Sequence, residues 1–405
     1  MAASLPWFTI VSVFLLLLTG PLNTMLTKVV FEIQSVGYYG EVKAFHKPWF
    51  TTLQMFLGMA PAILVHFCQV FVKTHQRLSE HRRALLEKPE IAAQQAAASS
   101  LPFWKAALYV AFPACLDMAG TTVSYVGLLY NSASVFTMMR GSIIVFSALL
   151  SMVFLHRKMN KQNWLGIFLC VVAVTLVGYA NLMSHDNATT AKSNTSTALV
   201  VFGMVMIVLS QIIQSLQLVT EEKFMKNINI PPFLVVGMEG IWGTLIMIFI
   251  TLPIVYFIPG NDSGSLENTL DSVVLYENSP EMQHLMGIYV ASIFLTNVSG
   301  VLVTKYLSSV HRTMISAMQT AVVWVVGLVS YYFLDPTMSF AEPWTFWSSV
   351  QLVGFMMLVL GQLVYAEVFD VPGFSTSRQP ELLNAEKMAI LKSPISIRAM
   401  VPDNH

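Results

Sequence analysis

The sequence predicts an all-α, polytopic membrane protein with ten transmembrane helices. Ten apolar stretches, each long enough to cross a bilayer, follow one another along the chain. Only 11% of the 405 residues are charged, against about 25% in a typical soluble domain, and the mean hydropathy is +0.64. An open sheet cannot satisfy its backbone hydrogen bonds in lipid, so each stretch is expected to be a helix.

The ten helices can be placed in order from their uninterrupted apolar runs. We expect them near residues 8–28, 49–72, 104–128, 132–154, 162–182, 198–220, 233–257, 285–305, 313–334 and 346–367. The first resembles a signal peptide in its position. However, MAASLPW carries no Lys or Arg, and the apolar run continues through Gly20-Pro21 without an A-x-A-type site. We therefore expect this first helix to be retained.

The polar segments are too short to form a domain of their own. The longest lies within 73–101, is rich in Ala, Gln and Glu, and lacks an apolar face for a core. Residues 371–405 are polar, and we expect a disordered cytosolic tail there. We divide the remainder into a first five-helix repeat at 1–182, which includes the cytosolic loop 73–101, and a second repeat at 183–370.

The distribution of basic residues predicts that both termini are cytosolic. With the N-terminus in the cytosol, only four of the 22 Lys and Arg residues fall in segments on the opposite side: Lys28, Lys43, Lys47 and Lys192. All others except Arg140, which lies inside a predicted span, fall in cytosolic segments. Because membrane proteins concentrate Lys and Arg on the cytosolic side, this orientation is favoured over its inverse.

Three N-glycosylation sequons agree with this orientation. Asn187, Asn194 and Asn261 each open an N-x-[ST] sequence, and all three fall in loops that the orientation makes luminal. We expect these asparagines to be glycosylated.

An internal similarity relates the two parts of the chain. A shift of 179 residues lays Ala133–Leu155 on Arg312–Leu334, so that Ser151 falls on Ser330. Each part has five helices, an odd number, so the second starts from the opposite face and the repeat is inverted. Inverted repeats are typical of transporters, whose substrate site lies near the midplane between them.

A stretch around the third and fourth helices resembles a known family. Cys115 to Ser151, CLDMAGTTVSYVGLLYNSASVFTMMRGSIIVFSALLS, is similar to the drug/metabolite transporter superfamily, as are GPLNT (20–24), EEKF (221–224), GMEG (237–240) and WLGI (164–167). Within it the chain resembles solute carrier family 35, subfamily F, and more distantly the chloroquine-resistance transporters. The resemblance implies two five-helix halves, cytosolic termini, alternating access and peripheral helices 5 and 10. It also implies an Arg where this chain has Gln319.

Helical spacing gathers polar residues on one face of several predicted helices. The ten candidate substrate-binding residues on these faces are Asn23, Asp117, Thr121, Thr137, Arg140, Gln214, Gln217, Glu239, Ser316 and Gln319. The helices that carry them, 1, 3, 4, 6, 7 and 9, are expected to line a central cavity. Ser and Thr stripes also serve as packing contacts between membrane helices, so for the hydroxyl residues both interpretations stay open.

Three charged residues are costly inside a span. On insertion scales a charge at mid-helix costs about 2.5–3.5 kcal/mol, so Arg140, Asp117 and Glu239 are expected to face a partner or water. One interpretation is an ion pair that fixes helices 3, 4 and 7. The other makes Arg140 a substrate contact and the two acids proton-coupling groups. In contrast, Glu221-Glu222-Lys223 at the predicted end of helix 6 is interpreted as an interfacial charge cluster.

Three functions remain open on this sequence. The leading hypothesis is a secondary active transporter or exchanger that moves a small polar or anionic metabolite, nucleotide-sugar-like, across an endomembrane such as the lysosome, endosome or Golgi. The first alternative is a proton-coupled exporter of amino acids, peptides or cations from an acidic organelle. The second alternative is a membrane adaptor that transports nothing.

Other classes are disfavoured by composition and motifs. The chain has no H-E-x-x-H, G-x-S-x-G or Walker motif and no Cys/His metal spacing, so we expect no enzyme, metal site or cofactor. Its net charge is zero, which predicts no nucleic-acid partner. The expected partners are a small-molecule substrate and the lipid bilayer, while proton coupling and homodimerisation stay open.

Overall fold

The structure is a computed structural model that describes residues 7–87, 102–154, 159–188, 197–228, 230–260, 262–307, 309–335, 338 and 340–368. In this part of the chain, ten helical spans are long and apolar enough to cross a membrane. They cover Trp7–Glu32, Pro48–Val72, Phe103–Leu129, Ala133–Phe154, Lys161–Ser184, Thr197–Lys226, Pro232–Phe257, Pro280–Tyr306, His311–Leu334 and Phe346–Tyr365. The predicted all-α polytopic membrane protein is therefore confirmed.

Six spans are formed by one helix each. These are α1 (Trp7–Glu32), α5 (Phe103–Leu129), α8 (Lys161–Ala188), α9 (Thr197–Asn227), α13 (Pro280–Tyr306) and α15 (Phe346–Tyr365). Their length follows from unbroken apolar runs, since about 20 residues at 1.5 Å per residue are needed to cross the hydrocarbon core.

Four spans are interrupted. They consist of α2 (Pro48–Met59) with α3 (Ala62–Glu87), α6 (Ala133–Arg140) with α7 (Ile143–Phe154), α10 (Pro232–Ile246) with the π-helix η1 (Met247–Thr251) and α11 (Leu252–Phe257), and α14 (Ser309–Val329) with the π-helix η2 (Ser330–Leu334). Pro61 lacks a backbone N–H, which interrupts the helical hydrogen bonding between α2 and α3. The break between α6 and α7 falls at Gly141-Ser142, directly after Arg140.

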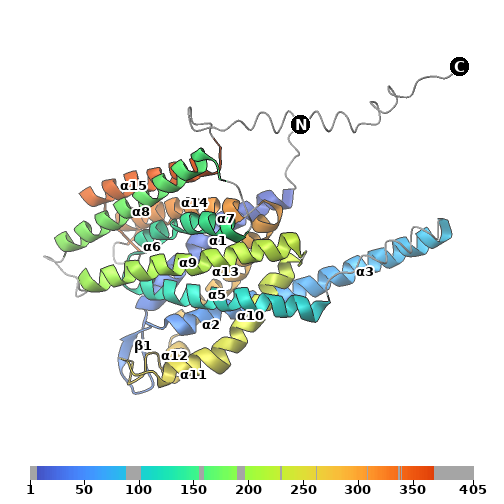
Figure 1. The fold of residues 1–405 in the computed structure, drawn as a ribbon. Helices are drawn as coiled ribbons and strands as arrows, with labels where there is room; N and C mark the ends of the chain where they lie inside the picture. Colours follow the sequence, from blue (N-terminus) through green and yellow to red (C-terminus); the bar gives the residue numbers. More distant parts are fainter. Residues whose placement is uncertain are drawn as a thin grey trace.

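We call the two ends of the bundle the hairpin face and the terminal face. At the hairpin face, β1 (Gln34–Val36) and β2 (Val42–Ala44) form an antiparallel hairpin beside the short helix α12 (Thr269–Glu277). At the terminal face, α1 begins, α15 ends, and α3 extends beyond the other helices (Figure 1).

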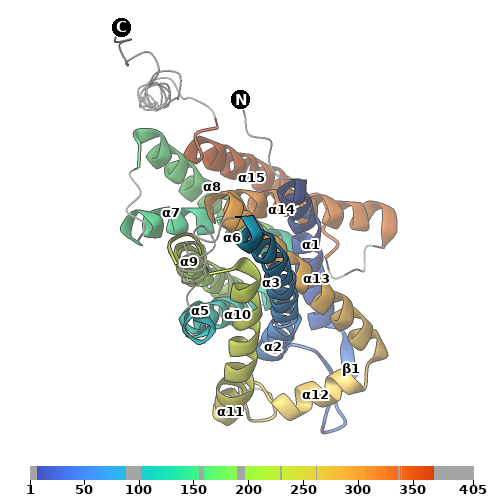
Figure 2. The same cartoon turned by 90° about the vertical axis from the view of Figure 1, so that its right-hand side faces the viewer.

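The fifth and tenth spans form a tight pair at the edge of the bundle. Helices α8 and α15 pack against each other, and Figure 2, a view onto the terminal face, shows them together at one side of the molecule. A Cβ on Gly166 would lie 2.5 Å from the backbone nitrogen of Tyr365, so the glycine of the WLGI motif permits this close approach. The peripheral position agrees with what the family resemblance implied.

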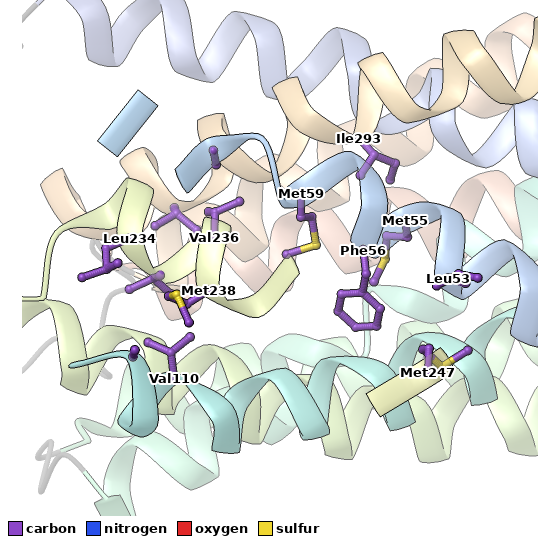
Figure 3. Packing of buried hydrophobic residues seen from close by; sticks show 14 of the residues in the cluster. Leu53, Met55, Phe56, Met59, Val110, Leu234, Val236, Met238, Met247 and Ile293 are labelled. Carbon is purple, nitrogen blue, oxygen red and sulfur yellow. The ribbon is translucent and has the colours of Figure 1, made fainter. Parts of the chain in front are cut away.

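An apolar core joins α2, α5, α10 and α13. Figure 3 shows Phe56 and Met59 of α2 among residues of α10, with Val110 of α5 and Ile293 of α13 nearby. A Cβ on Gly240 would lie 2.3 Å from the backbone nitrogen of Ala60. The glycine-rich face of α10 therefore allows this helix to lie directly against the break between α2 and α3.

The contacts between spans follow a repeating scheme. The spans are numbered from one to ten, and the numbering returns to one after ten. Adding five to both members of a contacting pair then gives another contacting pair in nearly every case. Span three packs against spans six and seven through α5–α9 and α5–α10, and span eight packs against spans one and two through α13–α1 and α13–α2. The pairs two–seven, four–nine and five–ten map onto themselves, and all three are present.

Some boundaries differ from those predicted. Helix α9 continues to Asn227 rather than ending near residue 220, because Glu221 and Glu222 find partners that allow them to remain in the helix. Helix α3 continues to Glu87, into the segment predicted as a cytosolic loop. The remainder of that loop, 88–101, and the predicted tail at 371–405 lie outside the described residues.

Candidate transport cavity

A cavity of about 190 Å³, lined by both polar and apolar side chains, lies inside the bundle. The described residues that line it come from α1, α2, α5, α6, α7, α9, α13 and α14, with Gly141 between α6 and α7. The predicted set of walls was wrong in two respects. Spans two and eight also line the cavity, through Met55 and through Ile293, Thr296 and Asn297, whereas the described part of span seven contributes no lining residue. Span seven lies behind α2 and α5, against which α10 packs.

Nine of the ten predicted substrate-binding residues line this cavity. They are Asn23, Asp117, Thr121, Thr137, Arg140, Gln214, Gln217, Ser316 and Gln319. The helical-face argument therefore brought together residues from α1, α5, α6, α9 and α14. Only Glu239 is absent from the lining residues that the structure describes.

Arg140 reaches the cavity from the C-terminal end of α6. Its guanidinium lies 5.5 Å from the ring centroid of Phe136, one turn earlier in the same helix. Within the described chain it has no ion pair and no hydrogen bond to another side chain. Its charge interacts over longer range with Tyr125, Arg312 and Asp117. The negative end of the α6 dipole, the aromatic face and the cavity together compensate for burying this cation.

Asp117 faces the cavity from α5 with one carboxylate oxygen in use. The hydroxyl of Thr121, one turn later, donates a hydrogen bond of 3.0 Å to Oδ1. The residue is only 7% exposed, and its longer-range electrostatic neighbours are Glu221, Arg312 and Arg140. The ion pair between Asp117 and Arg140, one of the two interpretations of these charges, is not formed, since no contact within 4.0 Å joins the two side chains.

A second arginine lines the cavity. Arg312 of α14 pairs with Glu221 of α9 at 3.0 Å, and Gln217 donates to the other oxygen of Glu221 at 2.8 Å. Sequence reasoning counted Arg312 as a cytosolic-loop residue and Glu221 as interfacial. The sequence did hold a signal that Arg312 faces the cavity. Arg312 lies four residues before Ser316 and seven before Gln319, so the three share one helical face.

Several polar groups of the lining are already used in helix contacts. Asn23 donates to the hydroxyl of Thr296 at 2.8 Å, which joins α1 to α13. Gln319 donates to the carbonyl of Leu16 at 2.7 Å, which joins α14 to α1. The hydroxyl of Ser316 donates to a carbonyl of its own helix. These contacts favour a packing role for these side chains, in addition to any contact with solute.

Glu239 is buried behind the cavity wall. It lies on α10, is 1% exposed, and its Oε1 has no hydrogen-bond partner. Its electrostatic neighbours are Glu221, Asp117 and Arg312. The carboxyl groups of Glu239, Glu221 and Asp117 thus all lie within electrostatic range of the guanidinium of Arg312.

An ion-pair network, which we call the hairpin brace, closes the hairpin face. It consists of Lys43, Lys47, Asp262 and Asp271. Both lysines contact Oδ2 of Asp271 at 2.8 Å, and both also pair with Asp262. Burial alone would raise the pKa of each aspartate, but hydrogen bonds from the two lysines hold it below its ordinary value. The brace therefore stays ionised well into the acidic range.

Two glutamates of the hairpin face cap helices that begin there. Glu267 accepts hydrogen bonds from the backbone N–H groups of Trp49 (3.0 Å) and Phe50 (2.8 Å) at the start of α2. Glu342 accepts one from Ser134 at the start of α6. Burial raises the pKa of Glu267 to about 8 and also raises that of Glu342, although the backbone N–H groups act in the opposite direction.

Charged contacts also join the helix ends at the terminal face. Glu222 accepts hydrogen bonds from the backbone N–H and the hydroxyl of Ser309, at the start of α14. Lys226 of α9 donates to the carbonyl of Leu307, and Lys305 donates to the carbonyl of Met225. Together with the Glu221–Arg312 pair, these contacts join α9 to α13 and α14 beside the cavity.

The predicted glycosylation sites are not placed by the structure. Asn194 and Asn261 lie outside the described residues, and Asn187 belongs to the last turn of α8, where only the backbone is described.

Ten apolar spans around a cavity with four charged side chains in its lining define a membrane transporter of solutes. The sequence model of the nucleotide-sugar transporter family matches residues 38–341. The chain is 31% identical over 358 residues to solute carrier family 35 member F6 of Rattus norvegicus and of Homo sapiens, across 87% of this chain and 86% of each relative. It is 26% identical over 272 residues to an uncharacterized protein of Schizosaccharomyces pombe, across 65% of this chain and 76% of that protein.

The chain therefore belongs to the nucleotide-sugar transporter family, and the expected resemblance to solute carrier family 35, subfamily F, is confirmed. The expectation that it is a transporter rather than an enzyme is confirmed by the same relationship.

Proposed function

We propose that this chain is a secondary active transporter or exchanger for a small polar metabolite with an anionic group, and that it works by alternating access. Arg140 carries this proposal, because its guanidinium faces the cavity and has no ion-pair partner among the described residues. A guanidinium binds a carboxylate or phosphate through two parallel hydrogen bonds, which gives both affinity and orientation. The family's description makes a nucleotide sugar one member of this class of cargo.

Alternating access requires two units that move against each other. The helix pairing supports two inverted five-helix repeats, at 1–182 and 183–370, because nearly all of its pairs recur when the span number is raised by five. The cavity lies between them and is lined by both. Rocking of one repeat against the other would expose it to either side in turn.

A charged network that joins the two repeats is suited to act as a gate. At the hairpin face, the brace joins Lys43 and Lys47 of the first repeat to Asp262 and Asp271 of the second. At the terminal face, the Glu221–Arg312 pair joins two lining helices of the second repeat, so it stays formed while the repeats move. Opening the hairpin face would break the contacts of the brace.

For the membrane setting, we propose that the terminal face is cytosolic and the hairpin face luminal, in an endomembrane such as the lysosome, endosome or Golgi. The Lys and Arg distribution supports this orientation. It also places Asn187, Asn194 and Asn261 on the luminal side, where they would be glycosylated.

A second candidate function is proton-coupled export from an acidic organelle. The carboxyl groups of Asp117, Glu221 and Glu239 favour it, since they lie within electrostatic range of one another and only Glu221 has an ion-pair partner among the described residues. The adaptor hypothesis is disfavoured, because an adaptor has no need of a charged cavity in its interior.

Uptake into proteoliposomes tests the proposal. The purified chain is assayed against a panel of nucleotide sugars, organic acids and amino acids, with and without a pH gradient. Whichever solute is transported, Arg140→Ala should abolish its uptake and leave abundance and melting temperature nearly unchanged. Arg140→Lys should rescue only part, because a lysine lacks the planar fork of donors.

The structural interpretation of Arg140 predicts a different pattern. Arg140→Ala would then misfold, and Arg140→Ala combined with Asp117→Ala would restore both folding and uptake. Full transport by Arg140→Ala would contradict both interpretations, and a proton gradient that drives uptake would select the second candidate function.

A further inference from the structure

The charges that face the cavity are balanced, and half of them are already paired. The described lining carries two carboxylates, Asp117 and Glu221, and two guanidiniums, Arg140 and Arg312. Glu221 and Arg312 neutralise each other at 3.0 Å. One carboxylate and one guanidinium therefore remain for a solute.

The two remaining groups are separated but close. No contact within 4.0 Å joins Asp117 to Arg140, yet each is among the electrostatic neighbours of the other. Asp117 is 7% exposed and has an oxygen, Oδ2, without a hydrogen bond in the described chain. A solute with a single negative charge would satisfy Arg140 and leave this buried carboxylate unpaired, which is unfavourable.

The size of the cavity also restricts the solute. Its volume of about 190 Å³ is below the about 300–1,000 Å³ of pockets that hold drug-sized ligands. The two phosphates of a nucleotide sugar would need both guanidiniums of the lining, and they would have to compete with Glu221 for Arg312. The wall also includes apolar side chains, among them Leu16, Met55 and Leu218, which suit a short apolar substituent.

From these observations we infer that the cargo is a small zwitterion, an amino-acid-sized solute with a carboxylate and an ammonium group. Arg140 binds the carboxylate through its fork of N–H donors, and Asp117 binds the ammonium. The paired residues Glu221 and Arg312 contact neither charge. This inference rests on the proposed function and narrows its cargo from anionic metabolites to zwitterions.

Chemical variants of one solute test the two charge contacts separately. Binding to the purified full chain is measured for L-alanine, L-leucine, L-serine and L-glutamine, and for UDP-glucose. The tightest amino acid is then compared with its N-acetyl form, which lacks the ammonium, and its amide, which lacks the carboxylate. Each derivative should bind about tenfold to a hundredfold more weakly, as expected for loss of a hydrogen bond to a charged group.

Protein variants should remove these preferences one at a time. Asp117→Asn should bind the amino acid and its N-acetyl form equally, while it still discriminates against the amide. Arg140→Gln should show the opposite pattern. Lys223→Met, an exposed position away from the cavity, controls for the handling of variants, and the melting temperature of each variant controls for folding.

The outcomes separate this inference from the proposed function. Binding of UDP-glucose without any amino acid, equal binding of the amino acid and its N-acetyl form, or no binding in this panel would overturn the zwitterion inference. Transport of an anion that depends on Arg140 would still leave the proposed function standing. Absence of transport for every solute in the proteoliposome panel would remove both.

Discussion

Loss of Lys47 should destabilise the protein strongly, because it is the more buried of the two lysines in the hairpin brace. The side chain is 3% exposed, and it contacts both Asp262 and Asp271, of which the Asp271 side chain is 0% exposed. Lys47→Met keeps the length of the side chain and removes its charge. Among the described residues, Lys43 is then the only lysine left to pair with the two carboxylates.

The magnitude follows from the burial of the partners. Removing one member of a buried ion pair costs about 3–5 kcal/mol, because the remaining charge stays buried without compensation. Lys43 still neutralises part of the charge, so the expected loss is near the lower end, about 3 kcal/mol. Lys47→Met combined with Asp271→Asn removes a charge from both sides and should be less destabilising than Lys47→Met alone.

Thermal unfolding in detergent, followed by tryptophan fluorescence, measures this loss. Lys223→Met, at an exposed position, is the matched control. The pKa of each brace aspartate is below its ordinary value, so its stabilisation is complete above about pH 3.9 and is lost only as the pH falls further. The effect of Lys47→Met should therefore be the same at pH 7.5 and pH 5. Equal melting of Lys47→Met and Lys223→Met would refute the reasoning.

Three further predictions concern pH, packing and topology. Burial raises the pKa of Glu267 to about 8, so its contribution to stability is full below about pH 4.3 and is lost as the pH rises towards 8. The wild-type protein should therefore melt at a higher temperature at pH 5.5 than at pH 8, and Glu267→Gln should reduce this difference. An unchanged difference would contradict the prediction. Gly240→Val should cost about 1–3 kcal/mol through the clash with Ala60, whereas Gly287→Ala, where nothing lies within 4 Å, should not lower the melting temperature. Protease added outside sealed, right-side-out organelle vesicles should remove the tail at His405, and protection of that tail would reverse the proposed orientation.

The spans and most of the cavity could be predicted because both depend on local periodicity. A membrane span is visible as a long apolar run, and a helix face follows from spacing along one helix. Asn23, Gln214 and Gln319 were found in this way and do line the cavity. Their hydrogen-bond partners were not predicted, since Gln319 contacts Leu16, about 300 residues away in sequence.

Features that depend on pairing between distant segments could not be read from the sequence. Lys43 and Lys47 appeared only as basic residues of a loop, and Asp262 and Asp271 only as acids of another loop. Span eight was overlooked as a cavity wall, although Ser292, Thr296 and Ser299 have the spacing of a polar helix face. Arg312 was assigned to a loop because its partner, Glu221, lies on a different helix.

Labelling of Gln214→Cys from each side of the membrane tests alternating access most directly. Gln214 lines the cavity near the middle of α9, and Cys68, Cys115 and Cys170 are first replaced by alanine. In sealed vesicles of both orientations, a membrane-impermeant maleimide should reach this cysteine from either face. Lys47→Met should raise labelling from the hairpin face and lower it from the terminal face, because it weakens the contacts that join the two repeats there. Labelling from neither face, or labelling from both faces that Lys47→Met does not change, would contradict the account.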